Sequence, residues 1–166
     1  MLRALASVAL LLPLGCADDP VEQPVPPDVA HARACALGLA HDPPPDDGTG
    51  VRMFCSTPIL RVSDLRASLQ HYEQRLGFST AWVWGEPASF AAVRRGHVEL
   101  FVCEDCQGQP GTWVSIFIDN VDQLHREYER RGATIIVPPT NYEWGMREML
   151  IEDLDGHRLR MGQGID

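Results

Sequence analysis

Lysine is absent from this sequence: all 14 basic residues are arginines, set against 23 Asp and Glu in 166 residues, and the formal net charge is −9. Nucleic-acid binding needs clustered basic side chains that neutralise phosphates, so this balance argues against nucleic acid as a partner. An acidic chain suits a cationic ligand better. Apolar residues make up 45% of the chain and charged residues 22%. This is the balance of a globular protein, which excludes a wholly disordered or collagen-like chain.

No apolar run reaches the roughly 20 residues that a membrane-spanning helix needs. The run Ala4–Leu14 is short, follows Arg3 and ends at Gly15-Cys16, which is the pattern of a secretory signal. The stretch 12–16 also resembles a bacterial lipobox, in which the cysteine is lipidated and becomes the new N-terminus. We therefore expect residues 1–15 to be removed on export and Cys16 to anchor a periplasmic or cell-surface lipoprotein. An ordinary signal peptide is the alternative.

Residues 16–55 are rich in proline and acidic side chains, with proline clusters at Pro24–Pro27 and Pro43–Pro45. Such a segment buries too little apolar surface to offset the entropy lost on ordering. Proline runs also favour extended, semi-rigid spacers. We expect a tether that holds the following domain away from the membrane.

Residues 56–163 contain the same pattern twice, and residues 164–166 are a short tail. In each unit a strand leads to a capping residue, Asp64 or Asn120, then to a helix with apolar residues on one face, and then to a glycine, Gly77 or Gly132. The offset that aligns the two caps also aligns Tyr72 with Tyr128. The expected strands are 59–62, 78–84, 89–94 and 97–103 in the first unit, and 113–118, 133–137, 147–152 and 158–162 in the second.

The pattern is a tandem β-α-β-β-β repeat of the α+β class. A single unit cannot cover both faces of its sheet. Two units side by side are expected to form a half-open, cupped mixed β-sheet with the helices outside.

These motifs resemble the vicinal-oxygen-chelate superfamily, in its glyoxalase and bleomycin-resistance branch. In the first unit, the motifs that show the resemblance are Arg61–Leu65 and the following His71–Phe78. In the second unit they are Trp144–Glu148 and Glu152–Leu159. The family turn usually reads Asp-Pro-Asp-Gly, and Leu154 replaces that proline.

The resemblance also implies where a metal would be bound. Metal-dependent members use His, Glu or Gln from four strands of the cupped face. Those positions fall here on Thr57, Glu99, Trp113 and Arg160, and only Glu99 can ligate a metal. Arg160 places a permanent cation where the ion would lie. We therefore expect no metal centre, no cofactor and no metal-dependent catalysis.

Aromatic side chains are expected around the few charged groups of the cupped face. Strand alternation places Phe101 with Glu99, and Phe117 with Trp113. An aromatic wall beside a charge suits a planar or cationic organic ligand. Two alternatives stay open: Trp82 and Trp84 fill the core, and Glu99 pairs with Arg160. The expected ligand-binding residues are Trp82, Trp84, Glu99, Phe101, Trp113, Phe117, Trp144 and Arg160.

Four cysteines follow Cys16, and an even number in an exported chain suggests disulfides. A Cys103–Cys106 bond would close a tight loop, and a Cys35–Cys55 bond would staple the tether. Crossed pairings, a redox pair and a zinc half-site are the alternatives. The acidic residues between Cys103 and Cys106 raise thiol pKa values, which argues against a reactive thiolate.

The leading hypothesis is an exported binding protein that sequesters a small, cationic organic molecule, and the resemblance implies a homodimer with a ligand groove at the subunit interface. The first alternative is a metal-dependent lyase or dioxygenase that uses a shifted ligand set with Glu99 and His97. The second is a non-catalytic surface interaction module. No nucleophile elbow, glycine-rich phosphate loop or paired zinc-ligand spacing points to another catalytic class.

Overall fold

The computed structural model describes residues 48, 50 and 55–165. The expected signal peptide, the lipidated Cys16, the tether and the Cys35–Cys55 bond fall wholly or largely outside these residues. In the part of the chain that is described, no helix has the length and apolarity to cross a membrane. The elements are β1 (Ile59–Val62), α2 (Leu65–Gln74), β2 (Ser79–Gly85), β3 (Ala88–Arg95), β4 (Val98–Glu104), β5 (Trp113–Phe117), α3 (Val121–Arg131), β6 (Thr134–Tyr142), β7 (Met146–Glu152) and β8 (Arg158–Gly164).

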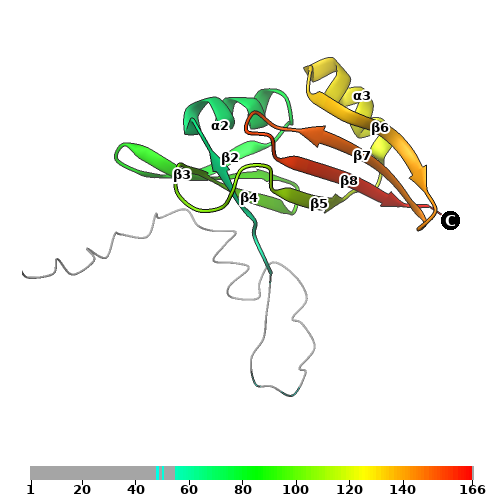
Figure 1. The fold of residues 1–166 in the computed structure, drawn as a ribbon, viewed down its shortest axis with the longest axis horizontal. Coiled ribbons are helices and arrows are strands. Elements are labelled where there is room, and N and C mark those ends of the chain that lie inside the picture. The colour runs from blue at the N-terminus through cyan, green and yellow to red at the C-terminus, as the bar shows by residue number, and fades with distance from the viewer. Residues whose placement is uncertain (1–47, 49, 51–54, 166) are drawn as a thin grey trace, which may run out of the picture.

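The strands form two four-stranded sheets, ordered β1-β4-β3-β2 and β5-β8-β7-β6. In each sheet the first strand of the unit pairs in parallel with the last, and the other neighbours are antiparallel. Both helices lie on one side of the sheets (Figure 1). The predicted α+β class and the tandem β-α-β-β-β order are therefore confirmed.

The predicted helix caps are confirmed. The side chains of Asp64 and Asn120 accept hydrogen bonds from the backbone N–H groups of Ala67 and Gln123, each at 2.8 Å. Such bonds satisfy donors that a helix N-terminus otherwise leaves unpaired. Gly132 ends α3 in the left-handed conformation, as expected. The first helix ends earlier than expected, with Gly77 two residues beyond its C-cap.

Strand β6 is longer than the sequence predicted, because it continues through Pro138 and Pro139 to Tyr142. Proline lacks a backbone N–H and is tolerated at a sheet edge. Strand β6 is an edge strand, and its pairing with β7 shifts register between Val137 and Thr140. The edge position and this irregularity accommodate two residues that otherwise signal the end of a strand.

One hydrophobic core underlies both units, because alternate strand residues pack beneath α2 and α3. The β7–β8 turn of the second unit also docks against α2 of the first. Buried Asp153 accepts a hydrogen bond from the hydroxyl of Tyr72 at 2.8 Å. Asp155 accepts from the backbone N–H and the hydroxyl of Ser63. Buried His157 bonds to the carbonyl of Arg61 through Nε2 at 2.8 Å. These contacts hold the two units together.

Two buried tyrosines in this core are expected to make the fold sensitive to alkali. Burial raises the pKa of Tyr128 to about 12. Burial and the adjacent Asp153 carboxylate raise the pKa of Tyr72 well above its usual range. A raised pKa means that the folded state holds the phenolic proton more tightly than the unfolded chain, so this stability is complete below about pH 10 and is lost as the pH rises towards 12.

We expect Tyr128 alone to remove about 2–3 kcal/mol of unfolding free energy across this interval. Tyrosinate absorbance and far-UV circular dichroism, recorded in one pH titration, should change together. Ionisation of all the tyrosines near pH 10, with an unchanged circular dichroism spectrum, would contradict this expectation. The Tyr72→Phe variant should show a smaller absorbance step at the unfolding transition.

Gly77 makes room for an ion pair between the two units. Its φ is +69°, and a Cβ there would lie 2.7 Å from Nη1 of Arg95 and 2.9 Å from Oε1 of Glu127. Arg95 donates to Oε2 of Glu127 at 2.7 Å. Gly96 also has a positive φ, but a Cβ added there meets no atom within 4 Å.

A Gly77→Ala variant should therefore lose about 3 kcal/mol of unfolding free energy, whereas Gly96→Ala should lose about 1 kcal/mol. Both substitutions strain the backbone, and only the first displaces the Arg95–Glu127 pair. Urea denaturation of the two variants measures the difference. Equal midpoints would show that the close approach at Gly77 is relieved without cost.

Candidate functional site

The two sheets share an open face, which we define as the side opposite α2 and α3. On β4, Leu100 and Val102 belong to the core cluster, so the alternating Glu99 and Phe101 lie on the open face. The same alternation applies to the other strands. The open face carries the side chains of Trp82, Trp84, Phe90, Glu99, Phe101, Trp113, Ser115, Phe117, Glu148 and Arg160.

The larger of two hollows on the open face measures about 620 Å³ and is lined by Glu99, Trp113 and Phe117, among others. Glu99 is only 6% exposed, and neither of its carboxylate oxygens has a hydrogen-bond partner among the described residues. Trp113 and Phe117 are 63% and 76% exposed. A buried carboxylate without a partner is costly. This hollow therefore combines a buried carboxylate that has no hydrogen-bond partner among the described residues with accessible aromatic rings.

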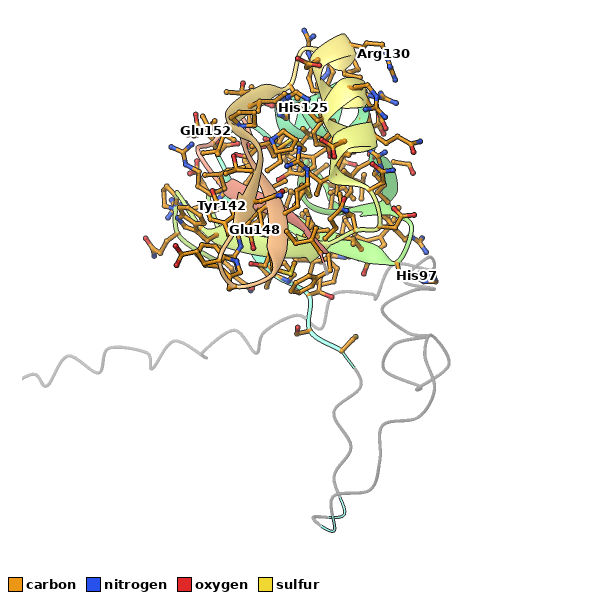
Figure 2. The ribbon with its side chains drawn as sticks, turned by 90° about the vertical axis from the view of Figure 1, so that its right-hand side faces the viewer. His97, His125, Arg130, Tyr142, Glu148 and Glu152 are labelled. Atoms are coloured by element: carbon orange, nitrogen blue, oxygen red, sulfur yellow. A yellow bond between two sulfur atoms is a disulfide. The ribbon has the colours of Figure 1, made fainter. Side chains whose placement is uncertain are left out.

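The smaller hollow measures about 190 Å³ and also touches Trp113. Trp144 stacks on Tyr142 with ring centroids 4.4 Å apart, and its indole N–H donates to Oε1 of Glu148 at 3.3 Å. Arg160 donates to the hydroxyl of Ser115 at 2.9 and 3.2 Å, and its Nη1 lies 3.9 Å from Oε2 of Glu148. Figure 2 shows Tyr142 and Glu148 close together in this part of the molecule.

The structure places the sequence-predicted residues at different depths. Trp113, Phe117 and Trp144 are exposed. Trp82 is buried and contacts the rings of Phe90 and Phe101, with centroids 5.5 and 5.2 Å away. It packs within the first sheet's own aromatic cluster. Trp84 shares this strand and is half-buried.

The ion pair between Glu99 and Arg160 that the sequence left open is not formed. Arg160 contacts Ser115 and Glu148 instead, because these residues lie on the strands on either side of β8. Sequence reasoning did not single out Tyr142 or Glu148. Glu148 carried a usable signal, since it alternates with buried Met149 on β7 and so faces away from the core.

The residues at the family's metal positions do not fit a metal ion. Thr57, Glu99 and Trp113 line the larger hollow, whereas Arg160 lines the smaller one. Within the described residues, no three His, Cys, Asp or Glu side chains lie close enough together to hold an ion. One carboxylate beside a tryptophan and a threonine is not a transition-metal donor set.

A disulfide joins Cys103 on β4 to Cys106 in the loop that follows this strand, which is one of the pairings considered from the sequence. Cys103 is fully buried beside the aromatic cluster. Cys55 is also disulfide-bonded. Neither Cys103 nor Cys106 is therefore available as a free thiol or a zinc ligand.

Comparison with known proteins identifies the family. The sequence model of the "Glyoxalase/Bleomycin resistance protein/Dioxygenase superfamily" matches residues 53–161. The chain belongs to this superfamily. The match agrees with the resemblance seen in the sequence and with the two β-α-β-β-β modules of the observed fold. No curated protein matches the chain significantly.

Several solved structures share the fold at low sequence identity. A bleomycin-binding protein complexed with bleomycin is 23% identical, with a TM-score of 0.57 over 66% of this chain and 98% of that one. TioX from Micromonospora sp. ML1 is 20% identical, with a TM-score of 0.58 over 67% and 100%. A virulence protein from Salmonella typhimurium is 20% identical, with a TM-score of 0.56 over 69% and 99%.

Proposed function

We propose that this superfamily member is an exported binding protein that sequesters a small organic cation on its open face, without catalysis and without a metal. The observation that carries the proposal is the buried, unpartnered carboxylate of Glu99 beside the exposed rings of Trp113 and Phe117. The similarity to a bleomycin-binding protein supports a ligand of this general kind.

The chemistry of the larger hollow favours a cation with a flat or apolar body. An ammonium or guanidinium group would satisfy the carboxylate oxygens of Glu99 with charge-assisted hydrogen bonds. Trp113 and Phe117 offer ring faces for stacking and for cation–π contact. An anion would be repelled by the carboxylate of Glu99, and a neutral molecule could not form an ion pair with it.

A second copy of the chain would complete the enclosure. Trp113 and Phe117 expose large apolar rings, and such rings mark interaction sites when they gather on one face. We propose a homodimer in which the open face of one copy covers that of the other and the ligand lies between them. Sedimentation velocity should give a dimer for the wild type and a monomer for the Phe117→Ser variant.

Export and lipid attachment at Cys16 form the second part of the proposal, and residues 3–16 support them. Expression of the full chain with radiolabelled palmitate should label the wild type but not a Cys16→Ala variant. A labelled Cys16→Ala protein, or an unlabelled wild type in the cytoplasm, would contradict this part.

Tryptophan fluorescence tests the ligand class directly, because both exposed tryptophans, Trp113 and Trp144, border the hollows. A panel of aromatic amines and guanidines should give saturable changes, whereas neutral molecules of the same shape should bind at least tenfold more weakly. The absence of a saturable change across the panel would instead favour a surface interaction module.

The metal-dependent alternative has one observation in its favour, since His97 and Glu99 line the same hollow. Elemental analysis of protein purified without chelators separates the two functions. Less than a tenth of an equivalent of zinc, nickel or iron supports the binding protein. One full equivalent that disappears in Glu99→Ala supports a lyase or dioxygenase.

A further inference from the structure

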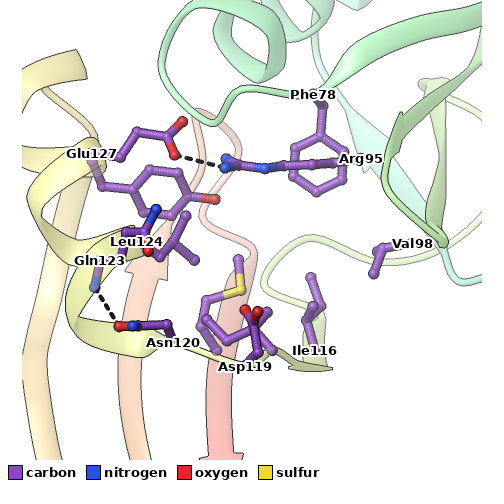
Figure 3. A pocket seen from close by; sticks show the side chains of 12 residues that line it. Phe78, Arg95, Val98, Ile116, Asp119, Asn120, Gln123, Leu124 and Glu127 are labelled. Atoms are coloured by element: carbon purple, nitrogen blue, oxygen red, sulfur yellow. Dashed lines mark hydrogen bonds and ion pairs between the residues drawn. The ribbon is translucent and has the colours of Figure 1, made fainter.

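A second cleft lies between the two modules on the helix side of the sheets, and it shares Val98 and Ile116 with the larger hollow of the open face. It measures about 250 Å³ and is lined by residues of both modules. Phe78 and Val98 border it from the first module, and Ile116, Leu124 and Met161 from the second. Its floor is therefore apolar. Figure 3 shows the space that these side chains surround.

The charges on one wall of the cleft are already compensated. Arg95 donates to Glu127 and, through Nη1, to the carbonyl of Leu76, each at 2.7 Å. Glu127 also accepts from Nε of Arg131 at 2.8 Å. Burial opposes the charge on Glu127, but hydrogen bonds from the two arginines outweigh it and lower the pKa of Glu127. Arg95 is thus not available to attract an anion.

The N-terminus of α3 does not attract an anion either. Two of the backbone N–H groups at this end of the helix already have side-chain acceptors. Val121 donates to the side chain of Gln163 at 2.6 Å, and Gln123 donates to that of Asn120 at 2.8 Å. Asp119 adds a carboxylate at this rim that forms no hydrogen bond or ion pair with another described residue. In Figure 3 this carboxylate points towards the space that Arg95 bounds on the opposite side.

We propose that this cleft is a second ligand site, for a small amphipathic organic cation such as a primary arylalkylamine. The apolar floor takes the hydrocarbon body, and Asp119 takes the ammonium group. The wall of Arg95 and Glu127 adds no net charge. Both modules contribute walls, so an occupant bridges them. This inference does not depend on the function proposed for the open face.

Phenethylammonium chloride is a suitable probe, and phenylpropionate is an anion of similar shape. In ¹⁵N-labelled full-length protein, phenethylammonium should saturably shift the backbone amides of Phe78, Arg95 and residues 118–124, which line the cleft and not the open face, with a Kd on the order of 1 mM. Phenylpropionate should not. Equal shifts with both probes, or no saturable shift in these segments, would overturn the proposal.

Two charge-neutralising variants locate the ammonium group. Because Asp119 is exposed, the Asp119→Asn variant should weaken binding in the cleft about fivefold. The Asp105→Asn variant makes the same change of charge at an exposed carboxylate outside the cleft and should retain wild-type affinity within twofold. Unchanged affinity in Asp119→Asn would contradict the assignment.

The Glu99→Gln variant separates this site from the open face. Shifts in the cleft should persist in that variant, because Glu99 does not line the cleft. Phenethylammonium shifts confined to residues 113–115 and lost in Glu99→Gln would overturn the cleft proposal while leaving the proposed function intact. Shifts confined to the cleft would support the cleft and count against the open face.

Discussion

The Asp153→Ala variant is expected to lose about 3–5 kcal/mol of unfolding free energy. The carboxylate of Asp153 accepts from the hydroxyl of Tyr72 at 2.8 Å and from the backbone N–H groups of His157 and Asp155 at 2.8 and 3.0 Å. Alanine would leave buried donors unpaired on both modules. Each such donor costs about 1–3 kcal/mol, which is more than a hydrogen bond usually contributes.

Chemical denaturation followed by circular dichroism measures this loss. Glu129→Ala is the control, because the Glu129 side chain is 59% exposed and pairs with His125 on the surface of α3. It should lose less than about 1 kcal/mol. Equal losses in the two variants would show that the contact between the β7–β8 turn and α2 adds nothing specific. A double-mutant cycle with Tyr72→Phe isolates the bond that joins the modules.

The Glu99→Gln variant is expected to bind the organic cation about 100-fold more weakly while its unliganded form becomes about 1–2 kcal/mol more stable. The affinity falls because the amide cannot form an ion pair with the ligand. The stability rises because the buried, unpartnered charge is removed. Opposite changes in stability and affinity are expected where a protein stores an unsatisfied charge for its ligand.

Fluorescence titration and thermal unfolding of the same sample test both changes together. Glu129→Gln is the matched control, because it removes one negative charge from α3, on the helix side of the sheets. That variant should keep the affinity of the wild type. A Glu99→Gln protein that is less stable and binds equally well would show that Glu99 has a structural role only.

Local patterns in the sequence predicted most of the fold. Asp64 and Asn120 cap helices because each side chain reaches a backbone N–H three residues ahead, an interaction that needs no tertiary context. Strand alternation correctly separated Glu99 from the core residues around it. The predicted end of β6 was wrong. Pro138 and Pro139 are tolerated because β6 lies at the sheet edge, and this position is a property of the whole sheet.

The candidate sites were harder to predict, because depth and partners depend on how the sheets pack. Strand alternation predicted on which face of the sheet Trp82 lies, but not that it is buried against Phe90 and Phe101. Arg160 was considered as a partner of Glu99, yet Glu148 on the adjacent strand lies nearer to it. The cleft beside Asp119 is lined by residues of both modules, so no local sequence pattern predicts it.

The prolines of β6 also bear on how copies of this chain meet. An edge strand normally presents a row of free N–H and C=O groups on which another chain can polymerise. Pro138 and Pro139 have no N–H to offer, and the register of β6 is irregular beside them. Growth of a continuous intermolecular sheet past this edge is therefore blocked. This protects the β6 edge against fibrous aggregation, whereas assembly through the open face does not use that edge.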